Sequence, residues 1–407
     1  QAAADAYKQE LIAAQKEAMG LTKAPVLREL PSYWTGFHGG PYSPELEVDT
    51  GVSTADIDRL GLGATATPHG FHLHPKVEKL LEERRRMAAG EKPIDYGMAE
   101  ALAFASLLER GIPVRLSGQD SRRGTFNHRH AALIDVENES LHFPLAGMAH
   151  AGAFFEVYDS MLSEAAVMGF EYGFSRDYPE ALVLWEAQFG DFANGAQTIV
   201  DEFISSGNAK WTQKSGVVLL LPHGYEGQGP DHSSMRIERW LQLCHEGALA
   251  VCQPSTPASY FHLLRTHAYV NWHRPVVIAT PKSMLRNKQA VSQPSDFTQG
   301  RWQPAMGDPT ITDPSKVDRI LICSGKLRWD LMTARHEAAL DDKVAILSLE
   351  RLYPLPAKEL AALLGELRRH RWNIAGLARE LGVSRNTVYR KMKRLDIDTD
   401  AQVGDGF

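Results

Sequence analysis

GVVLLLPHGYEGQGPDHSSMRIER, residues 216–239, joins the most apolar run of the chain to a loop rich in glycine, histidine and acidic side chains. The unbroken run predicts a strand that is buried on both faces, as in parallel sheets covered by helices. Similar runs alternate with helical segments, which predicts an α/β fold. These runs are ALVLWEA (181–187), LAVCQPS (249–255), PVVIATP (275–281), RILICSG (319–325) and KVAILSLERLYPL (343–355).

Changes in composition along the chain predict four parts. A polar, proline-rich stretch between residues 281 and 319 separates two groups of strands. The expected parts are a connecting helix with an extended wrap (1–90), an α/β domain (91–290), a second α/β domain (291–362) and a small all-α unit (363–398). In parallel sheets a ligand binds beyond the carboxyl ends of the strands, so the polar loops after the apolar runs are the candidate sites.

The composition is that of a globular protein with more than one domain: 407 residues, 43% apolar and 23% charged. A net charge of −6 excludes polyanion binding by the chain as a whole, although residues 366–397 are locally basic. Three cysteines without a C-x-x-C pair favour free thiols in a reducing cytoplasm over a disulfide framework. No apolar run approaches the roughly 20 residues of a membrane span, and no signal peptide is visible at the start.

Two histidines, His223 and His232, lie in the loop that follows the first apolar run. Histidine at such a position serves as an acid–base group or as a donor to a substrate carboxylate. Their spacing is not that of a helical metal pair, so zinc is disfavoured. The alternative is a flexible surface loop without a catalytic role.

Three further stretches admit a functional and a structural interpretation. The loop SGQDSRRGTFNHRHA (117–131) is either an anion site rich in arginine donors or a solvated polar loop. Glu164, early in an apolar helix after Ser163, is either an acid at the positive helix end or a buried acid with a raised pKa. Gln188 and Phe192 follow a strand, where an aromatic ring either stacks on a heterocycle or packs in the core.

Together these stretches resemble the decarboxylating dehydrogenase component of the 2-oxoglutarate dehydrogenase complex. The similarity extends from about residue 1 to about residue 360 and is densest between 93 and 290. The segments that carry it include SGQDSRRGTFNHRHA, VYDSMLSEAAVMGFEYG, WEAQFGDFANGAQTIVDEFISSG, LLLPHGYEGQGPDHSSMRIERWLQLC, PSTPASYFHLLR and TPKSMLRNKQAVS. The resemblance implies a transketolase-like pyrimidine-binding domain over 91–290, with a partial carboxy-terminal domain after it.

The resemblance also implies thiamine diphosphate as the cofactor. Glu164 falls on the position that protonates the aminopyrimidine ring, and Phe192 falls where an aromatic ring stacks on that pyrimidine. Gln188 lies beside Phe192, and Leu162 is assigned to the same cofactor-binding group. A carboxyl group held against a ring nitrogen suits proton sharing.

His232 falls on the family position that meets the substrate carboxylate, and His223 lies on the same loop. The implied reaction is decarboxylation of 2-oxoglutarate with transfer of the succinyl group to the lipoyl arm of a succinyltransferase partner. The family implies a homodimer. Nothing in the sequence implies a membrane partner.

The sequence departs from the family pattern at both ends. The diphosphate-binding domain, with the Asp and Asn ligands of Mg²⁺, lies upstream in the family and is not found here. The only GDG is Gly404 to Gly406, with no Asn after it. The carboxy-terminal domain also stops early. The isolated chain is therefore expected to give no measurable turnover.

In place of the missing strands the chain reads WNIAGLARELGVSRNTVYRKMKRL, residues 372–395. Helix, glycine turn and basic helix form the helix-turn-helix pattern, and the segment resembles the Fis-type domain of bacterial transcriptional regulators. The second hypothesis is therefore a DNA-binding regulator with an enzyme-like body. The alternative for the segment alone is a basic, solvated terminal helix. The residues assigned to double-stranded DNA are Arg385, Asn386, Thr387, Arg390 and Lys391.

Overall fold

The computed structural model describes residues 2–22, 31–43, 46–245 and 247–368, together with the single positions Ser384 and Arg390. The chain divides into two compact units, residues 1–35 and 36–407. The first unit contains helix α1 (Ala2–Met19), at the place where the sequence predicts a helix. No residue of this helix is buried.

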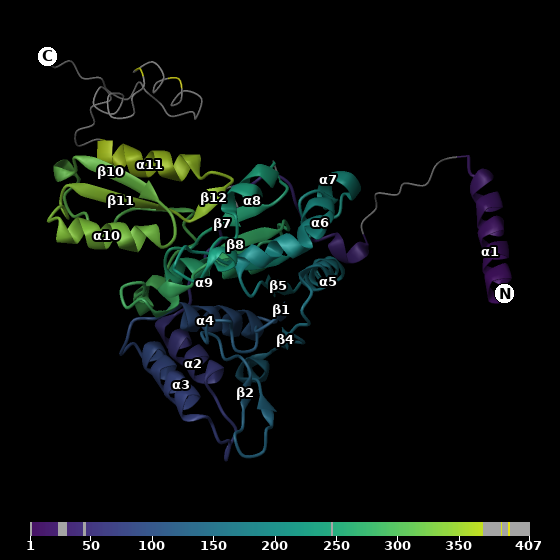
Figure 1. The fold of residues 1–407 in the computed structure, drawn as a ribbon, viewed down its shortest axis with the longest axis horizontal. Coiled ribbons are helices and arrows are strands. Elements are labelled where there is room, and N and C mark those ends of the chain that lie inside the picture. Colours follow the sequence, from purple (N-terminus) through teal and green to yellow (C-terminus); the bar gives the residue numbers. More distant parts are fainter. Residues whose placement is uncertain are drawn as a thin grey trace. The chain divides into compact units, whose positions relative to one another are not determined.

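A seven-stranded sheet forms the centre of the second unit, with the strand order β12-β7-β8-β6-β5-β1-β4 (Figure 1). All neighbouring strands run parallel except β12, which pairs antiparallel with β7. The strands are β1 (Val114–Gly118), β4 (Phe155–Asp159), β5 (Leu182–Glu186), β6 (Val218–Pro222), β7 (Ala250–Cys252), β8 (Val276–Thr280) and β12 (Arg351–Tyr353). The α/β fold predicted from the apolar runs is confirmed.

The unbroken apolar runs are explained by two cores, one on each face of this sheet. Along β6, Val218 and Leu220 pack into one core, whereas Leu219 and Leu221 pack into the other. Successive side chains of a strand point to opposite faces, so a strand between two cores must be apolar at every position. The first core is the larger and contains the helix α4.

Helices cover both faces of the sheet. Helix α4 is buried along almost its whole length, including Glu100, because it packs against the sheet, α2 and α9. Its first turn is capped by Asp95, whose side chain accepts a hydrogen bond from the Met98 amide. The helices of this part are α2 (Thr54–Ala64), α3 (Pro75–Ala88), α4 (Tyr96–Glu109), α5 (Glu164–Asp177), α6 (Gln197–Ile199), α7 (Gly207–Trp211), α8 (Ile237–Leu243) and α9 (Pro257–Tyr269).

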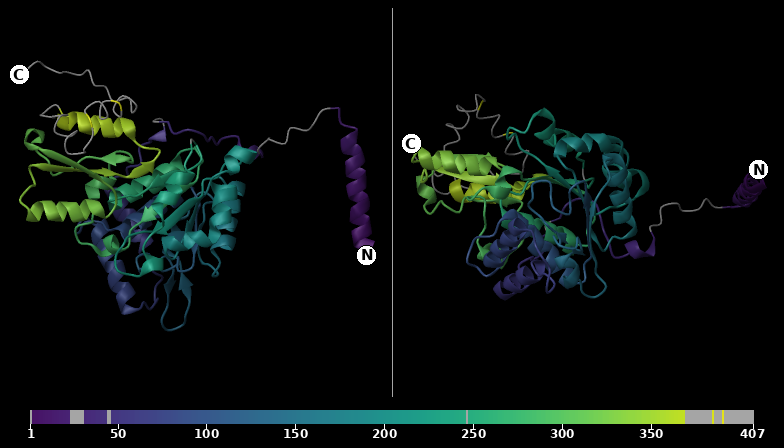
Figure 2. Two further views of the ribbon diagram at one scale, coloured as in Figure 1. Left: turned by 45° about the horizontal axis from the view of Figure 1, so that its top comes forward. Right: turned by 60° about the horizontal axis from the view of Figure 1, so that its bottom comes forward.

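A smaller sheet follows, with β10 parallel to β11 and β9 antiparallel to β11. Its strands lie between α10 and α11 in Figure 1 and in the left view of Figure 2. The chain then returns to the large sheet. Strand β12 begins two residues after the end of β11 and pairs with β7. The elements of this part are β9 (Ala305–Met306), β10 (Arg319–Cys323), α10 (Leu327–Glu337), β11 (Val344–Leu349) and α11 (Ala357–Arg368).

Several elements differ from those that the sequence pattern predicts. Helix α2 lies inside the stretch interpreted as an extended wrap. The segment Asn194–Ser205 consists of the end of a 3-10 helix, the short α6 and a π-helical turn. A small hairpin, β2 (Leu133–Ile134) with β3 (Leu141–His142), was not predicted. None of the described helices combines the length and the apolar character that crossing a membrane requires.

Gly118, the last residue of β1, permits the close approach of β1 and β5, and its replacement tests this packing. A Cβ atom at this position would lie 2.2 Å from the backbone oxygen of Glu186. Gly118→Ala should therefore lower the free energy of unfolding by about 1–3 kcal/mol, as overpacking does. Gly173→Ala in α5 is the matched control, because its Cβ would meet nothing within 4 Å. The control should stabilise the protein by roughly 0.5–1 kcal/mol in urea unfolding. Equal effects of both substitutions would contradict this account of β1.

Candidate active site

The candidate site lies at the carboxyl edge of the large sheet. Residues 119–131 follow β1, residues 160–163 connect β4 to α5, residues 187–197 follow β5, and residues 223–236 follow β6. Because these strands are parallel, their carboxyl ends share one edge, where ligands of such sheets bind. The four stretches interpreted as chemical from the sequence therefore begin at the same edge of one sheet.

Glu164 is the first residue of α5 and is half-buried. The preceding Ser163 caps the helix, its hydroxyl accepting a hydrogen bond from the Ala166 amide. The carboxylate oxygen Oε1 accepts a hydrogen bond of 3.0 Å from Gln119. The structure thus places Glu164 at the positive end of a helix, which was one of the two interpretations, and does not bury it fully.

Gly195 leaves the second carboxylate oxygen of Glu164 accessible. A Cβ atom at position 195 would lie 3.2 Å from Oε2. Among the residues that the structure describes, none donates a hydrogen bond to Oε2. One face of this carboxylate is therefore fixed by Gln119, while the other is open to a donor from outside.

His232 packs against two phenylalanine rings. Its ring centroid lies 4.5 Å from that of Phe189 and 5.4 Å from that of Phe192, both edge-on. The backbone carbonyl of His232 accepts a hydrogen bond of 2.8 Å from Lys282 Nζ. Lys282 is almost fully buried, and burial lowers its pKa. Phe192 and His232, predicted from separate loops, are thus in contact.

Gln188 links the loop after β5 to the loop after β1. Its side-chain Nε2 donates a hydrogen bond of 3.0 Å to the Asp120 carboxylate. Gln119, the neighbour of Asp120, holds Glu164. The Gln188 and Glu164 side chains are therefore connected through two adjacent residues of one loop.

His223 forms hydrogen bonds to backbone groups through its own amide and through its ring nitrogen Nδ1. Its own amide donates to the Thr280 carbonyl at 3.0 Å, and its Nδ1 accepts from the Met235 amide at 3.2 Å. Burial, followed by the nearby Lys282 cation, lowers the pKa of His223. An accepting Nδ1 assigns the ring proton to Nε2, so the ring is a neutral donor.

Leu162 is not joined to this group. Its side chain is 83% exposed, next to Met161, which is 72% exposed. The DNA-binding residues predicted from the sequence, Arg385, Asn386, Thr387 and Lys391, lie outside the described residues. Arg390 is described as one exposed helical position.

A buried ionic cluster beneath the site was not predicted. Arg129 donates hydrogen bonds to Glu100 at 2.6 and 3.1 Å, to Glu186 at 2.6 and 2.7 Å and to the Ser121 carbonyl at 3.0 Å. Tyr260 donates to Glu100 at 2.9 Å. Burial opposes the ionisation of Glu100, but the Arg129 cation outweighs it and holds the pKa of Glu100 below its ordinary value.

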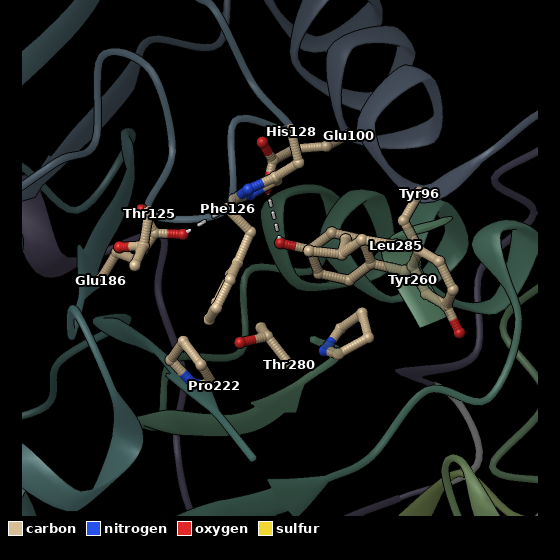
Figure 3. A pocket seen from close by; sticks show the side chains of 11 residues that line it. Tyr96, Glu100, Thr125, Phe126, His128, Glu186, Pro222, Tyr260, Thr280 and Leu285 are labelled. Carbon is tan, nitrogen blue, oxygen red and sulfur yellow. Dashed lines mark hydrogen bonds and ion pairs between the residues drawn. The ribbon is translucent and has the colours of Figure 1, made fainter. Parts of the chain in front are cut away.

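This cluster borders a pocket that Phe126 and His128 also line, at the carboxyl ends of β5, β6 and β8 (Figure 3). His128 lies beside Glu186, with 3.9 Å between Nε2 and Oε1. Its Nδ1 is buried and has no hydrogen-bond partner among the described residues. Burial, reinforced by the Arg129 cation, lowers the pKa of His128 to about 4. The ring is therefore neutral at physiological pH.

The sequence offered two weak signals for these residues. Glu100 is an acid in the interior of an otherwise apolar and small-residue helical pattern, and His128 and Arg129 belong to an Arg- and His-rich loop. Lys282 gave no signal of this kind. No group of three or more His, Cys, Asp or Glu side chains that could hold a metal ion occurs in the part of the chain that the structure describes.

Comparison with known families assigns most of the chain. Residues 92–288 match the family described as transketolase, pyrimidine binding domain. Residues 291–372 match the family described as 2-oxoglutarate dehydrogenase C-terminal. Residues 359–395 match the family described as bacterial regulatory protein, Fis family, so the two last matches overlap.

Curated relatives agree with the first two matches. The chain is 52% identical over 321 residues to the 2-oxoglutarate dehydrogenase E1 component of Cupriavidus necator, covering 78% of this chain and 34% of the relative. It is 45% identical over 364 residues to that of Azotobacter vinelandii, covering 89% and 38%. A multifunctional 2-oxoglutarate metabolism enzyme of Mycobacterium sp. is 52% identical over 328 residues, covering 78% and 26%. The chain thus spans about a third of the length of these relatives.

The buried neutral His128 should make folding stability depend on pH. Its pKa is about 4 in the folded protein, against about 6.5 in an unfolded chain, so the unfolded state binds more protons between these values. Stability should fall as pH decreases through this window, with about 2 kcal/mol lost to this group by pH 5.

His128→Gln should remove that part of the loss between pH 7 and pH 5, measured by urea unfolding at each pH. The exposed His150 provides the matched control, because its side chain contacts solvent in the folded and the unfolded chain. An unchanged pH dependence in His128→Gln would show that His128 is not held neutral.

Proposed function

We propose that this chain, a member of the 2-oxoglutarate dehydrogenase E1 family over residues 92–372, provides the pyrimidine-binding half of a thiamine diphosphate site. The reaction would be the oxidative decarboxylation of 2-oxoglutarate, with succinyl transfer to the lipoyl group of a succinyltransferase partner in the cytoplasm. The observation that carries the proposal is the convergence of Glu164, Gln188, Phe192 and His232 at one sheet edge.

The residues present fit a flat, nitrogen-containing ring. Glu164 keeps one carboxylate oxygen open beside Gly195, which has no side chain to fill that space. Phe192 is half-exposed on the same loop as Gly195, so part of its ring is available for stacking. These features form a cradle with one acid group and one aromatic face. When bound, thiamine diphosphate supplies the electron sink for decarboxylation.

Glu164 would share a proton with a ring nitrogen of the cofactor. Gln119 fixes Oε1, so Oε2 is the atom that holds or releases the proton. Proton sharing by a positioned carboxyl group contributes typically 10²–10⁴-fold to such reactions.

The loop after β6 would receive the substrate carboxylates. His223 is a neutral Nε2–H donor, and Lys282 brings a cation to the backbone of His232. Donors and a positive charge suit an acid with two carboxylates better than a neutral substrate. We assign His232 and His223 to substrate binding, and Lys282 to the positioning of His232.

A second subunit would complete the site. Met161 and Leu162 are exposed apolar side chains immediately before Glu164, and Phe170, farther along the same helix, is 59% exposed. Exposed apolar residues grouped beside a site are typical of an interface. We propose that a homodimer covers them, and that a diphosphate-binding domain there supplies the ligands of Mg²⁺.

Glu164→Gln tests the proposed proton role. The full chain is combined with the part of the Cupriavidus necator relative that it does not match, and 2-oxoglutarate-dependent ferricyanide reduction is measured with thiamine diphosphate and Mg²⁺. Glu164→Gln should lower kcat about 10²–10⁴-fold, since an amide cannot take up the proton. Glu202→Gln is the matched control, because Glu202 is an exposed acid paired with Lys210 outside the site. Equal activities of the two variants would refute the role of Glu164.

A second function, binding of double-stranded DNA, is favoured by the Fis-family match over residues 359–395. Helix α11 begins two residues before this region, overlaps its first part and also lies within the dehydrogenase match. We propose that the basic residues near the carboxyl end contact phosphates and base edges. Fis-type units that bind as pairs would be compatible with a dimeric enzyme body.

Arg390→Ala tests this second function in a gel-shift assay with duplex DNA at several salt concentrations. Loss of one phosphate or base contact should weaken binding about tenfold and reduce the salt dependence of the affinity. Arg59→Ala, an exposed arginine on α2, is the matched control. Absence of a shift with the unaltered chain at low salt would rule out DNA binding.

A further inference from the structure

A second cavity, of about 440 Å³, lies between the first half of α9, the segment 291–303 and α10. None of its lining residues belongs to the loops of the candidate active site. Cavities of roughly 300–1,000 Å³ are of the size that binds small organic molecules. This cavity therefore has the volume of a ligand site that is separate from the proposed reaction.

Arg328, the second residue of α10, lines this cavity and is 3% exposed. Its Nε and Nη1 atoms are buried, and neither has a hydrogen-bond partner among the residues that the structure describes. A buried charge without a partner is costly to keep in a protein. Arg335 on the same helix shows the usual arrangement, because it pairs with Asp308 at 2.5 Å and donates to Thr310 at 2.7 Å.

Glu350 is a second buried acid near this cavity, and among the described residues it forms no ion pair with Arg328. Its carboxylate is fully buried and accepts hydrogen bonds from the Ser255 amide and from the hydroxyls of Ser255, Ser259 and Ser348, all at 2.6–2.7 Å. These four hydrogen bonds satisfy both oxygens of the Glu350 carboxylate, with two donors to each oxygen. The guanidinium group of Arg328 therefore keeps hydrogen-bonding capacity that the protein does not use.

Asp296 and His262 also line the cavity, and both are engaged locally. The Asp296 carboxylate accepts from the Gln293 amide at 2.8 Å. His262 contacts Thr50 Oγ1 through Nδ1 and the Asp296 carbonyl through Nε2. Burial lowers the pKa of His262, so its ring is neutral. Neither side chain supplies the missing partner of Arg328.

The rest of the lining combines an indole ring with apolar, amide and hydroxyl side chains and with Arg301, which is paired with Glu47 at 3.3 Å. Trp329 is fixed by a hydrogen bond of 2.8 Å from Nε1 to the Ser255 carbonyl. Met306 and Met332 add flexible apolar surface, and Gln299 and Gln303 add polar groups. We propose that this cavity binds an organic anion, with its phosphate or carboxylate on Arg328 and a flat apolar body against Trp329.

The full chain is titrated with phenyl phosphate, benzoate and inorganic phosphate by calorimetry, and thermal unfolding is followed with and without each probe. Phenyl phosphate or benzoate should bind and raise Tm, and inorganic phosphate should bind more weakly, because it lacks the apolar body. Arg328→Met should weaken binding tenfold or more. The ligand-free Tm of this variant should stay equal or rise, because it removes an unpaired buried charge.

Lys326→Met is the matched control, since Lys326 is an exposed cation at the start of the same helix, paired with Asp330. It should retain binding. Arg328→Lys, which keeps the charge without the fork of donors, should bind with intermediate affinity. The proposal is overturned if no probe binds, if Arg328→Met binds as the unaltered chain does, or if Arg328→Met unfolds at a lower temperature. Equal affinity for phenyl phosphate and inorganic phosphate would overturn the apolar part of the site.

Discussion

Arg129, held between the carboxylates of Glu100 and Glu186, fixes the loop on which the candidate site depends. Glu100 belongs to the most buried helix and Glu186 to the end of β5, so the loop after β1 is tied to two rigid elements. Removing one partner of such a buried ion pair typically costs 3–5 kcal/mol, because the other charge stays buried. The same loop carries Gln119 and Asp120, which orient Glu164 and Gln188. The ion pairs of Arg129 therefore fix the loop whose side chains orient Glu164 and Gln188.

The sequence predicted those parts of the fold that depend on local pattern. Strands with an apolar residue at every position, such as β6, were predicted because both of their faces are buried. Strand β4 was not, because its burial weakens toward Asp159 at the edge of the sheet. Helix α2 was not predicted, because it lies in a stretch rich in proline and glycine. Its capping residue Ser53 is the sequence signal that could have located its start at Thr54.

For the site, the sequence supplied the residue types and the resemblance supplied the roles proposed for them, but neither supplied their hydrogen-bond partners. The contacts of Arg129 span 29 residues to Glu100 and 57 to Glu186, and Tyr260 reaches Glu100 across 160. No periodicity connects positions so far apart. Such pairs form because the parallel strands bring the ends of distant segments to one edge. Lys282 was missed for the same reason, since it follows β8 and contacts a loop that follows β6.

The return of the chain through β12 has a mechanical consequence for the smaller sheet. Residues Arg351 and Tyr353 pair with Cys252 and Val251, and the Gln253 amide donates to the Glu350 carbonyl at 2.8 Å. An exposed sheet edge is a template for unwanted pairing, and β12 covers this edge of β7. The same strand also acts as a rigid tether. Hinging of the smaller sheet away from the larger one would break the pairing of β12 with β7, so this pairing restrains the walls of the cavity that Arg328 lines.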